Sequence, residues 1–212
     1  ETPGAKTESL TIDAVIPGNV ELDLERAGIL PELFFGNNIK LLRKYEYYKW
    51  RYTIDADFPT HAEDERVILE FCGVDCFADY YLNGVRFGES DNALIPHRFD
   101  VTGLCHGGKN LLEVVIRSPL LEAAKKQYDA YEWAYVNNHE ALRVRKAPSQ
   151  YGWDIMPRAV TAGIWRPGKV IVMTPNEFSD FYITTLRADR NSATLSVAFQ
   201  FTTDTPRFEG LS

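Results

Sequence analysis

The segment from Tyr48 to Phe58 constrains the fold of this chain more than any other part of the sequence. One set of alternate positions is apolar and comprises Tyr48, Trp50, Tyr52, Ile54, Ala56 and Phe58. The intervening set is polar and comprises Lys49, Arg51, Thr53, Asp55 and Asp57. Because successive side chains of a strand point to opposite faces, this pattern predicts a long strand in a sheet with one buried and one solvated face.

Further strands are expected from alternation and from turn signals. They cover residues 66–71, 78–82, 85–88, 110–117 and 161–173, the last interrupted at Pro167-Gly168. Asn83-Gly84 lies between two of these runs and favours a tight hairpin, because both residues tolerate positive φ. The pattern predicts an all-β fold, a β-sandwich of jelly-roll type.

Helical signals are few. Asn19 is placed to cap a short helix that continues through Arg26 and stops at Gly28, and residues 120–133 are helix-prone. Residues 135–158 show no clean period and are polar and aromatic, so we expect a structured functional loop there.

A domain boundary is expected at Pro175-Asn176. Beyond it, residues 178–186 and 193–201 are expected to form two strands around a turn at residues 189–192. Two strands cannot bury an apolar face alone. We therefore expect one domain over residues 1–175 and the beginning of a second, truncated domain over residues 176–212.

The composition excludes several classes of protein. The 23 basic and 30 acidic residues give a net charge of −7, so the domain-wide basic surface of a nucleic-acid-binding protein is absent. No run of about 18 apolar residues occurs that could span a membrane. With 212 residues the chain is also shorter than the roughly 250 that a (β/α)₈ barrel requires.

Motifs of catalysis and metal binding are not visible. The four histidines are scattered, and no carboxylate cluster has calcium-loop spacing, so neither a metal nor a cofactor is expected. Cys72, Cys76 and Cys105 are best interpreted as small buried hydrophobic residues. One disulfide, or a zinc site that includes His106, remains an alternative.

Residues 143–166 are the most informative for function. Aromatic rings beside fixed charges suit sugar recognition, because a sugar offers an apolar C–H face to a ring and hydroxyls to a carboxylate or an arginine. Trp153-Asp154 supplies both elements from adjacent residues. The alternative is a buried structural tryptophan beside a salt-bridged aspartate.

Several stretches in a fixed order resemble the N-terminal part of glycoside hydrolase family 2 enzymes, and among these most closely the β-mannosidases. The stretches are Val15-Ile-Pro-Gly-Asn-Val, Phe34-Phe-Gly-Asn-Asn, Val74-Asp75, Ser90-Asp-Asn, Arg98-Phe-Asp-Val-Thr, Arg145-Lys, Gly152-Trp-Asp and Ala162-Gly-Ile-Trp-Arg-Pro. The resemblance implies a jelly-roll, galactose-binding-domain-like sandwich, followed by an immunoglobulin-like sandwich and a (β/α)₈ barrel. It places both catalytic glutamates in the barrel, outside these residues, so this chain alone is expected to be inactive.

The resemblance also assigns roles to individual residues. In such enzymes a loop of the first domain completes the −1 sugar subsite of the barrel, and its Trp-Asp pair matches Trp153 and Asp154. Arg145 is a weaker candidate, either for contacting the sugar or for orienting Asp154. Trp165 and Arg166 are expected to pack the strand that returns to the sandwich.

One departure affects the expected substrate. β-Mannosidases commonly read Trp-Asp-Trp-Gly-Pro where this chain reads Trp153-Asp154-Ile155-Met156-Pro157. The expected partners are a β-linked oligosaccharide or glycoside and the barrel of the same parent chain, with neither nucleic acid nor membrane. A β-mannoside is the first expectation, and a β-galactoside, glucuronide or glucosaminide is the alternative. A non-catalytic carbohydrate-binding module is the rival function, and secretion or a periplasmic location is expected from polysaccharide-degrading relatives.

Overall fold

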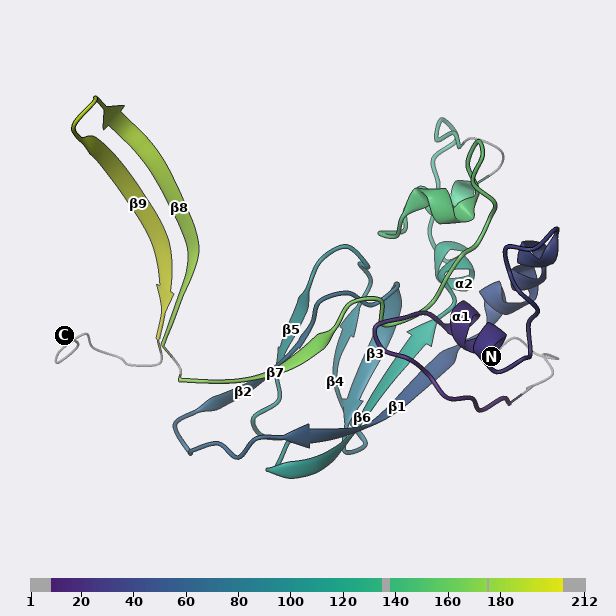
Figure 1. Ribbon diagram of the computed structural model, residues 1–212, viewed down its shortest axis with the longest axis horizontal. Coiled ribbons are helices and arrows are strands. Elements are labelled where there is room, and N and C mark those ends of the chain that lie inside the picture. The colour runs from purple at the N-terminus through teal and green to yellow at the C-terminus, as the bar shows by residue number, and fades with distance from the viewer. Residues whose placement is uncertain (1–8, 135–137, 175, 204–212) are drawn as a thin grey trace.

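Two antiparallel sheets form the body of the protein (Figure 1). The computed structural model describes residues 9–134, 138–174 and 176–203. The first sheet has the order β1-β6-β3-β4 and contains β1 (Trp50–Phe58), β6 (Gly108–Arg117), β3 (Phe77–Leu82) and β4 (Val85–Ser90). The second has the order β5-β2-β7 and contains β5 (His97–Asp100), β2 (Arg66–Phe71) and β7 (Gly168–Met173). The predicted all-β sandwich is confirmed.

The core lies between the two sheets, and the alternation in β1 decides which side chains enter it. Tyr52 and Phe58 are buried, whereas the intervening polar residues of β1 are exposed. Tyr80 of β3 is fully buried and packs against rings of the opposite sheet, with centroids 4.6 Å from Phe71 and 5.0 Å from Phe99. Apolar burial of this kind is the main favourable contribution to folding.

The hairpin between β3 and β4 turns where the sequence predicts it. Asn83 and Gly84 both have positive φ, 52° and 81°. The backbone amide of Leu111 in β6 donates to the side-chain oxygen of Asn83 at 3.0 Å. The turn is therefore tied to the neighbouring strand as well as closed by its own geometry.

The helices agree with the sequence only in part. α1 (Val20–Arg26) is capped by Asn19, which accepts a hydrogen bond from the Leu22 amide, as expected. The helix expected over residues 120–133 is wrong in length, because α2 (Pro119–Ala123) ends after five residues. Beyond it the side-chain ammonium of Lys126 donates to the carbonyl of Arg143 at 2.7 Å, which ties the end of α2 to the following loop.

In the described parts of the chain, three further helices of the 3₁₀ type and one short strand had no clear signal in the sequence. The helices are η1 (Asn38–Tyr47), η3 (His139–Ala141) and η4 (Pro148–Tyr151), and the strand is β5. Short 3₁₀ segments have poor hydrogen-bond geometry and depend on their surroundings, so sequence pattern alone rarely identifies them.

The strand expected over residues 161–173 begins only at Gly168. Upstream of Pro167 the backbone pairs with other segments. The amides of Gly18 and Val20 donate to the carbonyls of Ile164 and Ala162, both at 2.9 Å. This stretch therefore fastens the N-terminal segment to the sandwich instead of extending the sheet.

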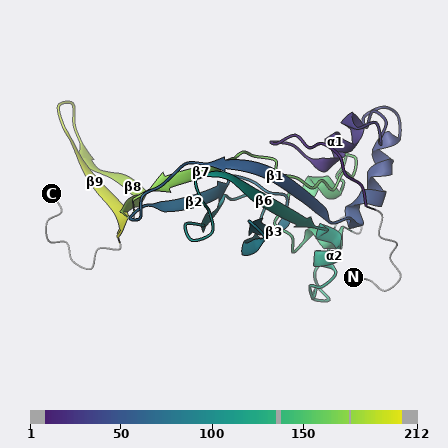
Figure 2. The same ribbon diagram turned by 90° about the horizontal axis from the view of Figure 1, so that it is seen from below.

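The last two strands form a separate hairpin, as expected. β8 (Glu177–Ala188) pairs with β9 (Ala193–Thr202), and Asp189 closes the turn by accepting from the amides of Asn191 and Ser192. Figures 1 and 2 show this hairpin at the opposite end of the molecule from α1 and α2. Pro175, at the expected domain boundary, and residues 1–8 and 204–212 lie outside the described residues.

Candidate functional site

The loop of residues 143–163, called the 143–163 loop here, is fastened to the sandwich through one buried carboxylate. Asp75 lies between β2 and β3 and is 5% exposed. Its Oδ2 accepts hydrogen bonds from the ammonium group of Lys146, from Thr161 Oγ1 at 2.9 Å and from Gln150 Nε2 at 3.4 Å. Both ends of the loop are thereby held at a single point.

Lys146 is an unusual residue for an interior. It is 2% exposed, and its ammonium group donates to the carbonyl oxygen of Thr161 as well as to Asp75. A buried ammonium is tolerated only when it is paired and hydrogen-bonded. The ion pair between Lys146 and Asp75 therefore fixes the geometry of the loop base.

The candidate sugar-binding residues lie on a tight turn at the far end of this loop. Residues 153–156, called the Trp153 turn, are closed by two backbone hydrogen bonds between Trp153 and Met156, 3.1 and 3.0 Å long. Trp153 is 59% exposed, and Asp154 is exposed. The alternative of a buried tryptophan beside a salt-bridged aspartate does not describe this exposed turn.

Arg145 is placed apart from the Trp153 turn. Its side chain is exposed, while its carbonyl oxygen accepts from the Ala93 amide at 2.8 Å and lies 3.5 Å from Cys76 Sγ. Among residues 9–134, 138–174 and 176–203, no hydrogen bond or ion pair joins Arg145 to Asp154. The structure thus brings Trp153 and Asp154 together and leaves the role of Arg145 as a proposal.

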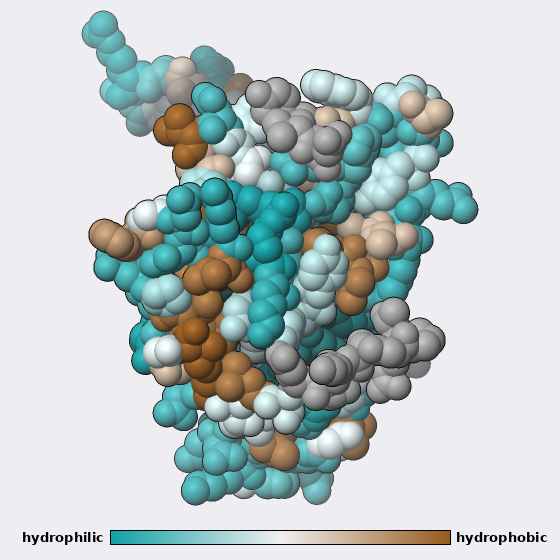
Figure 3. All heavy atoms as spheres, turned by 90° about the vertical axis from the view of Figure 1, so that its right-hand side faces the viewer, coloured by the Kyte–Doolittle hydropathy of each residue, from teal (hydrophilic) through white to brown (hydrophobic). Residues whose placement is uncertain are grey.

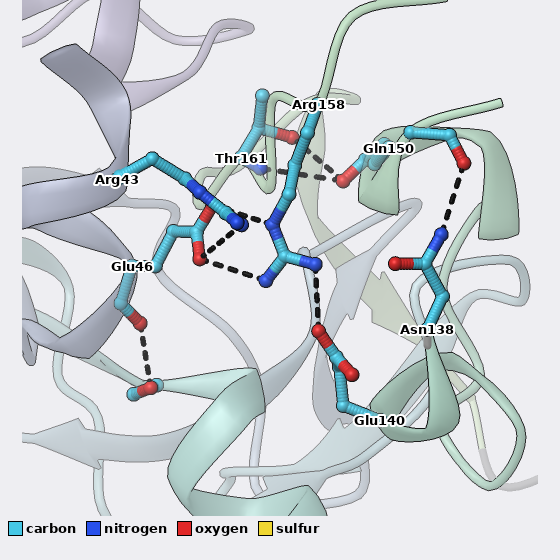
Figure 4. A network of polar contacts seen from close by, with 9 residues as sticks. Arg43, Glu46, Asn138, Glu140, Gln150, Arg158 and Thr161 are labelled. Carbon is cyan, nitrogen blue, oxygen red and sulfur yellow. Dashed lines mark hydrogen bonds and ion pairs between the residues drawn. The ribbon is translucent and has the colours of Figure 1, made fainter. Parts of the chain in front are cut away.

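Arg158 connects the base of the Trp153 turn to two other segments (Figure 4). Its Nε and Nη2 donate to the two carboxylate oxygens of Glu46, at 2.9 and 2.8 Å, and its Nη1 donates to Glu140 at 2.6 Å. The Glu46 side chain is 2% exposed and also lies 3.4 Å from Arg43. These charges stabilise the approach of η1 and η3 to the loop.

A second acidic side chain is buried close to the Asp75–Lys146 pair. Glu21 in α1 is 4% exposed, and its carboxylate accepts from the Ala162 amide at 3.3 Å. Burial disfavours the charged form and raises the pKa of Glu21 to about 7. Its charge therefore changes near neutral pH.

Trp165 and Arg166 have the packing role that the sequence suggests. The Trp165 indole donates to the carbonyl of Ala93 at 3.0 Å, and the guanidinium of Arg166 lies 4.2 Å from the Trp165 ring centroid. Gly73 leaves room for this ring, because a Cβ there would lie 2.6 Å from the indole nitrogen.

The cysteines and histidines form no visible ligand set. Cys72, Cys76 and Cys105 are free thiols, and only Cys76 is fully buried. Within the described parts of the chain, no group of three or more His, Cys, Asp or Glu side chains is arranged to hold a metal ion. The helices in those parts are also too short or too polar to cross a lipid bilayer.

The residues of the Trp153 turn are exposed and do not line the groove that runs along β1. The groove along β1, with a volume of about 930 Å³, is lined by residues 9–14, 16, 20, 23 and 48–55, and so excludes the turn. Figure 3 shows the end of the molecule that carries the helices, where apolar patches lie among hydrophilic side chains. A sugar site usually encloses most of its ligand, so a pocket at the turn requires a second surface.

Sequence reasoning missed the side chains that support the turn. Glu46 and Arg158 are 112 residues apart, and Asp75 and Lys146 are 71 apart, so no local spacing pairs them. Asp75 and Lys146 occur in stretches that carry the family resemblance, and Arg158 lies in the informative segment 143–166, but the sequence assigned none of them a supporting role.

Comparisons with known proteins point in one direction. Residues 2–166 match the family described as glycosyl hydrolase 2 galactose-binding domain-like. The chain is 35% identical over 173 residues to Beta-mannosidase B of Thermothelomyces thermophilus. The aligned residues cover 80% of this chain and 20% of the relative. It is 33% identical over 193 residues to Beta-mannosidase B of Emericella nidulans. Here the aligned residues cover 89% of this chain and 23% of the relative.

A solved structure is similar over nearly the same range. The crystal structure of Beta-D-Mannosidase from Dictyoglomus thermophilum is 33% identical, with a TM-score of 0.76, and the match covers 87% of this chain and 23% of that one. The chain thus spans about a fifth of the length of the curated relatives it matches.

Proposed function

The chain belongs to glycoside hydrolase family 2 as a galactose-binding domain-like part, and on this premise we propose that it is the N-terminal accessory domain of a longer, retaining exo-β-glycosidase. The proposed substrate is a β-mannoside. The support is the similarity to enzymes called β-mannosidases, which are about four times as long. The catalytic acid/base and nucleophile then belong to a barrel elsewhere in the longer protein.

The observation that carries the proposed role is the exposed Trp153 turn on its fixed loop. A turn that carries an exposed indole and an exposed carboxylate on adjacent residues fits a sugar ring, because the ring has both hydroxyls and an apolar face. We propose that Asp154 accepts hydrogen bonds from sugar hydroxyls in the −1 subsite and that Trp153 forms a wall of it. Arg145 is proposed only as a further donor at the rim.

The identity of the sugar is the least constrained part of the proposal. Ile155 is 91% exposed and Met156 is 50% exposed, so both are available to touch a ligand or the barrel. They stand where the β-mannosidase pattern has tryptophan and glycine. This observation favours a second candidate, a family 2 enzyme that acts on another β-glycoside.

Residues 176–212 are proposed to begin an immunoglobulin-like domain. In β8 and β9, large apolar side chains such as Phe181, Ile183 and Leu195 are more than half exposed. A two-stranded hairpin with such side chains is marginal by itself. The remaining strands of a sandwich would cover them.

The test is hydrolysis of aryl β-glycosides by the whole protein: mannoside, galactoside, glucoside, glucuronide and glucosaminide. We expect the mannoside to be preferred by about tenfold or more in kcat/KM, a difference of about 1.4 kcal/mol in transition-state stabilisation. Preference for another sugar would contradict the substrate and implicate Ile155 and Met156. Hydrolysis of none would contradict the enzyme assignment.

The rival function, a carbohydrate-binding module, is tested with the 212-residue chain alone. The 212-residue chain is expected to hydrolyse none of these glycosides and to bind mannose weakly, because Trp153 and Asp154 are exposed and a sugar site usually encloses most of its ligand. Binding to mannose or mannobiose in the micromolar range, measured by calorimetry, would favour the rival.

A further inference from the structure

We propose that Arg158 is a positioning residue that holds the Trp153 turn in the place from which Asp154 reaches the sugar. This inference rests on the proposed function of the turn. Arg158 itself is not proposed to contact the sugar. It acts through the stem of the turn, which is the backbone at residues 150–152 and 158–159 on its two sides. Three sets of contacts support that role.

The first concerns the stem, where Gly152 and Arg158 lie side by side. Gly152 has φ of 98° and ψ of 136°, a conformation that side-chain-bearing residues rarely adopt. A Cβ at Gly152 would lie 3.4 Å from the Cβ of Arg158. Asn138 donates to the Gly152 carbonyl at 3.1 Å, and the amide of Ala159 donates to Gln150 at 2.8 Å. The backbone on the two sides of the turn is therefore held together directly beside Arg158.

The second concerns the guanidinium group, which joins three segments of the chain. It pairs with both oxygens of Glu46 in η1 and with Glu140 in η3, and it lies 5.3 Å from the ring centroid of Tyr151 in η4. Figure 4 shows the guanidinium between the two carboxylates. A planar group bonded on two sides is held in position and in orientation.

The third concerns the anchor on the sandwich. The carbonyl of Glu46 accepts from Ser118 Oγ at 2.6 Å, and Ser118 also caps α2 directly after β6. A line of short contacts thus runs from β6 through Ser118, Glu46 and Arg158 to the turn. Since Asp154 is exposed at the tip, the stem sets its position.

The informative substitution is Arg158→Lys. Lysine keeps the charge but lacks the planar fork, so it cannot pair with Glu46 through two parallel hydrogen bonds and with Glu140 at once. A displacement of about 1 Å can cost two orders of magnitude in rate, so we expect kcat/KM on an aryl β-mannoside to fall by about tenfold or more. Glu140→Gln, which removes one ion pair, is a milder second variant with a smaller expected loss in the same direction.

The experiment is a double-mutant cycle in the whole protein with Asp154→Ala. If Arg158 acts through Asp154, the double variant should be no worse than Asp154→Ala alone, within about twofold. Losses that multiply would overturn the proposal, as would Arg158→Lys activity within twofold of the wild type. If Arg158→Lys does not fold, the double-mutant cycle is made with Glu140→Gln and Asp154→Ala instead, and losses that multiply would again overturn the proposal.

The controls separate this inference from the proposed function. Arg86→Lys is matched, because Arg86 also joins two carboxylates, Asp79 at 2.7 Å and Glu89 at 2.5 Å, but on the β3–β4 hairpin. It should leave kcat/KM unchanged. If Asp154→Ala has no effect, the proposed function fails and the inference with it. If Asp154→Ala lowers kcat/KM and the Arg158 loss is independent of it, only the inference fails.

Discussion

Glu21 shows how burial of one residue couples the fold to pH. It stands in the first turn of α1, where an acidic residue is usually favoured by the helix dipole, yet it is almost fully buried. Loss of solvation outweighs the hydrogen bond from Ala162 and the attraction of Lys146, and it raises the pKa of Glu21 to about 7. The folded chain therefore holds the Glu21 proton more tightly than the unfolded chain.

The sign of the pH dependence follows directly. Between the ordinary pKa of 4.5 and about 7, the folded state binds more protons at Glu21 than the unfolded state, so this group lowers stability as pH rises through that window. We expect Glu21→Gln to raise the free energy of unfolding by about 3 kcal/mol at pH 8 and to change it little at pH 4.5. Urea unfolding at both pH values measures this, with the exposed Glu63→Gln as control. Equal effects of Glu21→Gln at both pH values would contradict the assignment.

At the scale of elements, the 143–163 loop depends on the Asp75–Lys146 ion pair. Removing only the lysine leaves a carboxylate buried without its counter-charge, which typically costs about 3–5 kcal/mol. We expect Lys146→Met to lose about this much stability in urea unfolding, and Asp75→Asn combined with Lys146→Met to lose less.

A matched lysine is available for comparison. Lys125 pairs with Glu122 at 2.7 Å on the exposed side of α2, and its replacement by methionine should cost well under about 1 kcal/mol. A loss below about 1 kcal/mol for Lys146→Met as well would show that the buried pair does not hold the loop.

The same elements show what sequence reasoning can reach. β1 and the Asn83-Gly84 turn were predictable because alternation and positive φ are local properties of consecutive residues. The length of α2 was not, since tertiary context routinely overrides helix propensity. Trp153 and Asp154 were found as a pair of residue types, whereas their exposure and their support by Arg158 depend on tertiary structure.

At the scale of the whole molecule, different parts of the chain lie at the two ends of the sandwich. One end carries the β8–β9 hairpin, and the other carries α1, α2 and the 143–163 loop (Figure 1). The sandwich between them has a conventional core and serves as a rigid support. This arrangement is compatible with the proposal that the exposed Trp153 turn contributes to a sugar subsite formed together with another part of a longer protein.

We propose that Asp154 contacts the sugar in the −1 subsite, and kcat/KM of Asp154→Ala in the whole protein on an aryl β-mannoside tests this contact. We expect a fall of at least about 10²-fold, or about 2.7 kcal/mol of transition-state stabilisation, with the unfolding temperature unchanged because Asp154 is exposed. A kcat/KM within threefold of the wild-type value would contradict the claim.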